Sequence, residues 1–120
     1  MQENMNILLN GSRVLLVISF GMITFLATQE IISDFQSSIN DKVIHLACFF
    51  YLTTISWLAK ILDKDLWVYV IVLAYGILIE VVQMYIPYRS FELLDILADF
   101  TGILLASFFI KFVKDLYPNY

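Results

Sequence analysis

Residues 75–109 read YGILIEVVQMYIPYRSFELLDILADFTGILLASFF, and this stretch decides how the chain folds. Two long apolar runs are separated by a short connection at Pro87, because proline cannot continue a helical hydrogen-bond ladder. Polar side chains nevertheless recur inside the runs, at Glu80, Gln83, Asp95 and Asp99. An ionised group at the centre of a bilayer helix costs roughly 2.5 to 3.5 kcal/mol. Such residues therefore usually have a partner, a water-filled recess or a function.

The composition of the whole chain indicates a membrane protein. Hydrophobic residues fill 61% of the 120 positions and the mean hydropathy is +0.83, whereas soluble domains are about 45 to 50% apolar. A span needs about 20 apolar residues to cross about 30 Å of hydrocarbon, so the chain has room for three or four spans and little else. We therefore expect one domain over residues 1–120. The net charge of −4 and the membrane location exclude nucleic acid as a partner.

Four apolar runs predict four transmembrane helices. We expect them at about residues 13–32, 42–62, 66–86 and 91–113. Only helices and closed barrels satisfy their backbone hydrogen bonds in lipid, and these runs are too long and continuous for barrel strands. The predicted fold class is therefore an all-α integral membrane bundle of four helices.

The placement of Lys and Arg predicts the orientation, because short connections rich in positive charge stay in the cytoplasm. Four spans place both termini and the turn near residues 63–65 on one side. The basic residues of that side are Arg13, Lys60, Lys64, Lys111 and Lys114. The opposite side carries only Lys42 and Arg89. Five against two predicts an N-in/C-in protein.

Helical spacing places the polar residues of each helix on one face, since positions three, four and seven apart are neighbours. If these faces point inward, their polar ends converge on one recess that opens to the outside. The converging residues are His45, Glu80, Gln83, Asp95 and Asp99. Below them, Gly102 and Ala106 have the small-xxx-small spacing that lets two helices approach closely.

Three carboxylates in a low-dielectric recess cannot all stay charged cheaply, so we expect at least one to keep its proton. Groups of this kind serve as general acids and proton carriers. A structural role remains an alternative for each residue. Gln83 could cap a neighbouring backbone, and Arg89 could pair with Glu92 or a lipid phosphate. Asp95 could bind the free N–H groups at the start of the last helix.

We predict no metal site and no cofactor. One imidazole with two or three carboxylates suits a divalent ion, but the chain has a single histidine and no compact ligand motif such as HExxH. A serine nucleophile also lacks support, because no glycine elbow surrounds Ser90.

Two segments, DKVIHLACFFYL at 41–52 and YGILIEVVQMYIPYRSFELLDILADFTGILLA at 75–106, carry a family resemblance. The chain resembles the VanZ-like family of small bacterial membrane proteins, named for a protein linked to teicoplanin resistance. Four motifs match in order, namely DKxxH, IExxQ, PxR and DxxANxxG, at residues 41–45, 79–83, 87–89 and 95–102. Two positions depart from the family pattern. Asp99 stands where the family usually has Asn, and Ala106 stands where glycine is frequent.

The resemblance and the recess together imply a multi-pass protein of the bacterial cell membrane that binds or modifies a lipid-linked envelope component. Such an activity would lower susceptibility to teicoplanin and other lipoglycopeptides. In this hypothesis Lys42 and Arg89 hold a phosphate or pyrophosphate, His45 and Glu80 exchange a proton, and Asp95 orients His45. The predicted catalytic residues are His45, Glu80 and Asp95, and the predicted binding residues are Asp41, Lys42, Gln83, Arg89 and Asp99.

Two other functional classes stay open. A non-catalytic bundle or accessory subunit would use the polar cluster only to fix the helix register. A small proton-coupled transporter would need a dimer, because four spans offer little machinery for alternating access. The expected partner is a membrane lipid or lipid-linked precursor, and a homo-oligomer is compatible with each class. The residues alone do not decide whether the protein is an enzyme.

Overall fold

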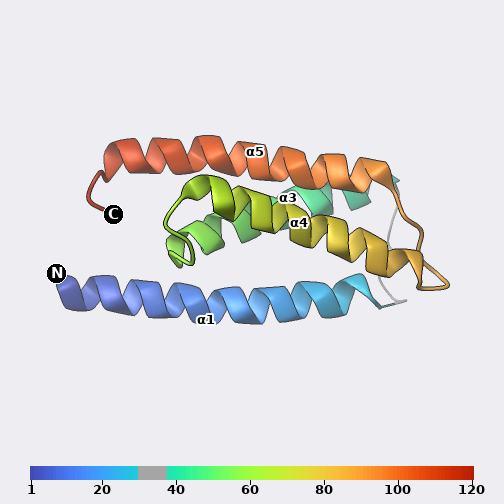
Figure 1. The fold of residues 1–120 in the computed structure, drawn as a ribbon, viewed down its shortest axis with the longest axis horizontal. Helices are drawn as coiled ribbons and strands as arrows, with labels where there is room; N and C mark the ends of the chain where they lie inside the picture. Colours follow the sequence, from blue (N-terminus) through green and yellow to red (C-terminus); the bar gives the residue numbers. More distant parts are fainter. Residues whose placement is uncertain (30–37) are drawn as a thin grey trace.

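The computed structural model describes residues 1–29 and 38–120, which form an antiparallel bundle. Its helices are α1 (Gln2–Ala27), α3 (Ser38–Leu58), α4 (Asp65–Met84) and α5 (Leu93–Leu116). No strand occurs in these two ranges, so the predicted all-α class is confirmed. Successive helices run in opposite directions, so α1 is parallel to α4 and both termini lie at the same end of the bundle (Figure 1).

The helix boundaries of α4 and α5 lie close to the predicted ones, whereas α1 and α3 differ more. α1 begins at Gln2, well before residue 13, because the helix continues through a more polar segment that lacks proline. Its predicted end at residue 32 lies outside the described residues. α3 begins at Ser38 and ends at Leu58. Lys60, just beyond that end, has a left-handed φ of 46°, a common way for a chain to leave a helix.

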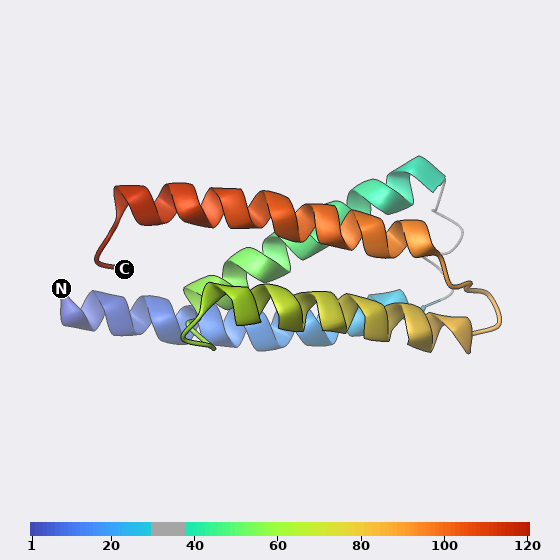
Figure 2. The ribbon, with the colours of Figure 1, turned by 45° about the horizontal axis from the view of Figure 1, so that its top comes forward.

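Three helices in the described part of the chain, α1, α4 and α5, are long and apolar enough to cross a membrane. The prediction of four such helices is wrong for α3. Polar residues in its first turns, and the buried hydroxyl residues Thr53 and Ser56 near its other end, lower its apolar content. α3 accommodates them because it contacts all three other helices, crossing them obliquely (Figure 2). Asp41, Thr53 and Ser56 are therefore buried against protein.

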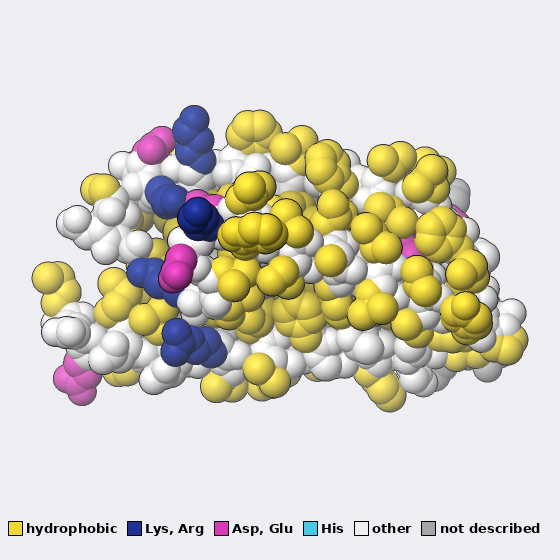
Figure 3. Space-filling model, viewed as in Figure 1, with side chains coloured by type: hydrophobic (Ala, Val, Ile, Leu, Met, Phe, Trp, Pro, Cys, Tyr) yellow, Lys and Arg dark blue, Asp and Glu magenta, His cyan; other side chains and the backbone are white. Residues whose placement is uncertain are grey.

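The apolar core lies where α3 meets α4 and α5. Its buried centre consists of Phe49, Leu52, Val68, Val72 and Ile103. α3 and α5 approach closely at Gly102, where an added Cβ would collide with the carbonyl oxygen of Leu46. Many large hydrophobic side chains are instead exposed, and they cover most of the face drawn in Figure 3. A bundle with an apolar exterior and buried polar groups is the arrangement expected in lipid.

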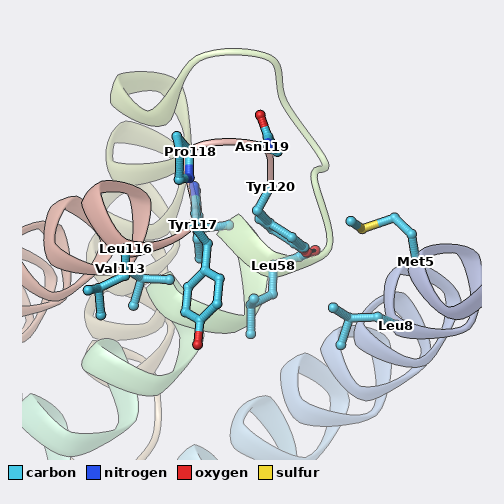
Figure 4. A pocket seen from close by; sticks show the side chains of 10 residues that line it. Met5, Leu8, Leu58, Val113, Leu116, Tyr117, Pro118, Asn119 and Tyr120 are labelled. Atoms are coloured by element: carbon cyan, nitrogen blue, oxygen red, sulfur yellow. Dashed lines mark hydrogen bonds between the residues drawn. The ribbon is translucent and has the colours of Figure 1, made fainter. Parts of the chain in front are cut away.

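The end of the bundle that carries the termini is held by contacts of basic and aromatic residues. Lys114 Nζ lies 2.7 Å from Asp65 Oδ2, and Arg13 Nε donates to the Ala59 carbonyl at 3.1 Å. The Tyr120 hydroxyl donates to the Leu58 carbonyl at 2.5 Å, and burial raises the pKa of this phenol. A largely apolar cavity of about 470 Å³ lies beside these contacts (Figure 4). Lys and Arg side chains gather near this end in Figure 3.

Candidate functional site

The predicted polar residues lie at the opposite end of the bundle, where α3 and α5 begin and α4 ends. α3 and α5 are parallel, so their first turns are adjacent, and the last turns of α4 meet them from the other direction. Five of these side chains are at most 6% exposed, although each is polar. They are Asp41, Glu80, Gln83, Asp95 and Asp99. The helical faces that the sequence predicts to be polar are therefore buried.

His45 lies between three carboxylates. Its Nδ1 donates a hydrogen bond to Asp99 Oδ1 at 2.7 Å. Its Nε2 lies 3.6 Å from Asp95 Oδ2 and 3.8 Å from Asp41 Oδ1, and both distances exceed a hydrogen bond. The carboxylate that orients the imidazole is therefore Asp99, whereas the sequence hypothesis assigns this role to Asp95. The register of the two parallel helices explains the difference, because it sets Asp99 level with His45 and Asp95 level with Lys42.

Lys42 is surrounded by acidic groups. Its ammonium contacts Asp95 Oδ1, lies 2.5 Å from Glu92 Oε2 and lies 3.4 Å from Asp41 Oδ2. The predicted phosphate-binding role of this lysine therefore competes with three carboxylates. Glu92, which the sequence suggested as a partner of Arg89, is a site residue that the prediction omits. The sequence feature that could have identified Glu92 is its spacing of three residues from Asp95, because residues three apart lie on the same side of a helix.

Glu80 connects the end of α4 to the start of α5. Its Oε2 accepts a hydrogen bond from the backbone N–H of Glu92 at 3.1 Å. Glu80, rather than Asp95, thus binds a backbone group at the start of α5. Its Oε1 is buried without a hydrogen-bond partner among the described residues, and so is Asp99 Oδ2. Buried carboxyl oxygens without partners are rare and indicate a bound proton, a water or a ligand.

Gln83 and Arg89 bind the end of α1. Gln83 Nε2 donates to the Ala27 carbonyl at 3.0 Å, and Arg89 Nη2 lies 3.5 Å from the Gln29 carbonyl. The backbone-capping role that the sequence left open for Gln83 is therefore the one observed. Both side chains lie beside the carboxylate cluster and do not join it through these contacts.

A cavity of about 320 Å³ opens beside the cluster, between α1, α3 and α4. Its wall has a polar part and a larger apolar part. The polar part consists of Asp41, His45, Gln83 and Arg89, and the apolar part includes Ile23, Leu26, Ile44, Phe49 and Ile79. This combination suits an amphiphilic molecule, because a polar head and a hydrocarbon segment each find a matching wall.

The arrangement offers two kinds of chemistry. The His45–Asp99 pair can accept or donate a proton at the cavity wall, since a hydrogen-bonded carboxylate fixes the ring and stabilises its charged form. Metal binding is the second kind. Within the part of the chain that the structure describes, Asp41, His45 and Asp95 each offer one ligand atom, and these atoms lie within 4.8 Å of one another.

Comparison with known proteins identifies the family to which the chain belongs. A family model described as VanZ/LLP1 matches residues 3–114, a range that contains every residue of the site. No curated protein and no solved structure matches the chain.

Proposed function

Because the chain belongs to the VanZ/LLP1 family, we propose that it binds or modifies a lipid-linked component of the bacterial cell envelope at the outer leaflet of the membrane. In a host sensitive to glycopeptides with a lipid tail, this activity lowers susceptibility to teicoplanin. The observation that carries the proposal is the cavity with one polar and one apolar wall beside the His45–Asp99 pair.

The cavity wall suggests a role for each group. Arg89 has the planar, always charged side chain that suits a phosphate head group. His45, held by Asp99, exchanges a proton with the bound head group, and the buried carboxyl of Glu80 is the second proton carrier. The apolar wall takes the first part of the lipid chain. Lys42 has a supporting role in this version, because its contacts are to carboxylates.

The proposal includes an orientation. We place both termini in the cytoplasm, because the end of the bundle near them carries Arg13, Lys60 and Lys114. α1 and α4 run in the same direction (Figure 1). If both cross the membrane, α3 has to cross between them, although it is less apolar than the other helices. The cavity then faces the outer leaflet.

A susceptibility assay tests the proposal. Wild type, His45→Ala, Glu80→Gln and the control Asp65→Asn are expressed at equal membrane abundance in a teicoplanin-sensitive host. Asp65 pairs with Lys114 at the other end of the bundle and is partly exposed, so its loss costs little. We expect wild type and Asp65→Asn to protect the cells, and the other two variants to protect less. Equal protection by all four proteins would rule out proton exchange, and no protection by wild type would overturn the resistance proposal.

A structural role for the polar cluster is the second candidate, and the contacts of Lys42 favour it. This one side chain joins α3 to Glu92 and Asp95 and so fixes the register of α3 and α5. A purely structural cluster predicts that Glu80→Gln loses function only in proportion to its loss of stability. Asp95→Asn, which removes a buried charged partner of Lys42, should cost about 3 to 5 kcal/mol of stability. Thermal unfolding in detergent, measured beside the susceptibility assay, separates the two roles.

A further inference from the structure

Two carboxylates in the site each face two different neighbours. Asp41 Oδ2 and Asp95 Oδ1 contact the ammonium of Lys42. Their other oxygens, Asp41 Oδ1 and Asp95 Oδ2, lie 3.8 and 3.6 Å from His45 Nε2. These two distances are too long for hydrogen bonds. Three atoms that commonly bind metals, one from each residue, therefore lie within 4.8 Å of one another.

We infer that Asp41, His45 and Asp95 bind a divalent transition-metal ion of the Zn²⁺ or Mn²⁺ class. Zinc lies about 2.0 to 2.2 Å from imidazole nitrogen and carboxylate oxygen, which places neighbouring ligands of a tetrahedral site about 3.3 to 3.6 Å apart. The separations of His45 Nε2 from the two carboxylates are close to that range, and the three ligand atoms all lie within 4.8 Å of one another. An imidazole ligand favours these ions over Mg²⁺ and Ca²⁺, which prefer oxygen ligands alone.

The second nitrogen of His45 supports this inference. Its Nδ1 donates to Asp99 Oδ1 at 2.7 Å, which fixes the ring with Nε2 toward the two carboxylates. Metal-binding histidines are oriented in the same way, by a hydrogen bond from the other ring nitrogen to a carboxylate or carbonyl.

A buried oxygen beside the three ligands is an independent sign of a bound group. Glu80 is completely buried, and its Oε1 has no hydrogen-bond partner among the described residues. Its carboxyl lies next to that of Asp95, one of the three ligands, and its Oε1 forms no hydrogen bond to it. A water molecule bound to a metal ion at the three ligands would supply the missing hydrogen bond.

The charge of the site points to a cation as well. The cluster contains five acidic residues and one lysine, namely Asp41, Glu80, Glu92, Asp95, Asp99 and Lys42. A phosphate head group is repelled by such a cluster unless a cation lies between them. The ion would provide this bridge, a role that rests on the proposed function, whereas the binding of the ion does not. With the ion bound, His45 Nε2 would be a ligand, so His45 would act on the head group through the ion and not by exchanging a proton with it.

Metal titration of the purified full-length protein in detergent, with the purification tag removed, tests the inference. The probes are ZnCl₂, MnCl₂ and, for comparison, MgCl₂, followed by calorimetry. We expect one Zn²⁺ or Mn²⁺ per chain, and a loss of affinity of about tenfold or more in Asp41→Asn and His45→Ala. The matched control Glu92→Gln removes a partner of Lys42 but no ligand, so its affinity should fall much less than that of Asp41→Asn.

Lys42→Gln provides a test of opposite sign. Removing the ammonium beside Asp41 and Asp95 should tighten metal binding, and this result decides the matter if His45→Ala does not fold. The inference is overturned if wild type binds no metal, if Glu92→Gln loses as much affinity as Asp41→Asn, or if Lys42→Gln binds no more tightly. Metal binding in a protein that gives no teicoplanin protection would uphold the ion site and overturn the proposed function. Teicoplanin protection by a protein that binds no metal would overturn the ion site and uphold the proposed function.

Discussion

Gly76 is a residue whose missing side chain makes room for the site. A Cβ atom there would lie 2.7 Å from Asp99 Oδ2 and 2.8 Å from Phe49 Cε1. The Phe49 ring in turn stacks against His45, with 6.5 Å between the ring centroids and 7° between the planes. Gly76 therefore admits both the carboxylate that orients His45 and the ring that packs on it.

We expect Gly76→Ala to lower the free energy of unfolding by about 1 to 3 kcal/mol, because the added methyl group overpacks the site. The matched control is Gly21→Ala in α1, where no atom other than those of the local helix backbone and the adjacent residues lies within 4 Å of the added Cβ. Alanine is the better helix former, so the control should be neutral or more stable by about 0.5 to 1 kcal/mol. Chemical unfolding in detergent measures both. Equal stability of the two variants would contradict the described packing.

At the residue scale, the helical period predicts which side chains are buried but not which of them pair with one another. The spacing of Asp95 and Asp99 predicts that both face inward, and both are buried. Which of them meets His45 depends on the register of α3 against α5, to which the close approach of Gly102 to Leu46 and the contacts of Lys42 both contribute. No local sequence pattern encodes that distance. Glu92 was missed for a related reason, since it lies in a connection whose path is fixed by its contacts.

At the element scale, α1 differs from the other helices in how it is held. Little of its surface is buried, and several of its contacts are polar. Ser19 Oγ lies 2.7 Å from the hydroxyl of Tyr51, and Thr24 Oγ1 lies 2.6 Å from the hydroxyl of Tyr75. Gln83 adds a hydrogen bond to the Ala27 carbonyl at the end of α1. Hydrogen bonds between side chains on different helices are typical of association in lipid.

Gln83→Leu should loosen the last turn of α1. The substitution removes the donor that satisfies the Ala27 carbonyl, at a cost of about 1 to 3 kcal/mol. Hydrogen exchange followed by mass spectrometry should show faster exchange in the last turn of α1 and little change in the rest of the helix. Met84→Leu, an exposed neighbour on α4, is the control. Identical exchange in both variants would show that this bond does not hold α1.

The elements themselves were predicted to different degrees. α4 and α5 lie within three residues of their predicted bounds, because apolar runs and Pro87 mark their limits. The start of α1 was missed, because hydropathy marks the part of a helix in lipid and not the part that continues beyond it. α3 shows the opposite limit. A helix that contacts three others can carry polar residues at buried positions. Its apolar content is therefore too low to predict that it lies inside the bundle.

At the scale of the whole molecule, the two ends differ in charge. The bundle is 50 Å long, so both ends extend past a hydrocarbon layer of about 30 Å. Lys114 and Arg13 lie toward the end with the termini, and the carboxylate cluster lies toward the other. This difference in charge is the basis of the proposed orientation, because positively charged ends tend to stay in the cytoplasm.

Cysteine labelling tests that orientation. In a Cys48→Ala background, Ser90→Cys and Asn119→Cys place single thiols at exposed positions on opposite ends. A membrane-impermeant maleimide should label Ser90→Cys in intact cells, and should label Asn119→Cys only after the cells are permeabilised. The reverse pattern would place the site in the cytoplasm, and labelling of both in intact cells would show that the two ends share one side.

The central claim is that the site acts on a lipid-linked envelope component, and lipid analysis tests it most directly. Membranes are compared from cells that carry an empty vector, wild type or His45→Ala, with the two proteins at equal abundance, and lipids that copurify with each protein are identified by mass spectrometry. The account predicts that wild type retains or alters a phosphate-bearing lipid, and that His45→Ala does so much less. Identical lipid profiles in all three membranes, with no lipid retained selectively by wild type, would contradict it.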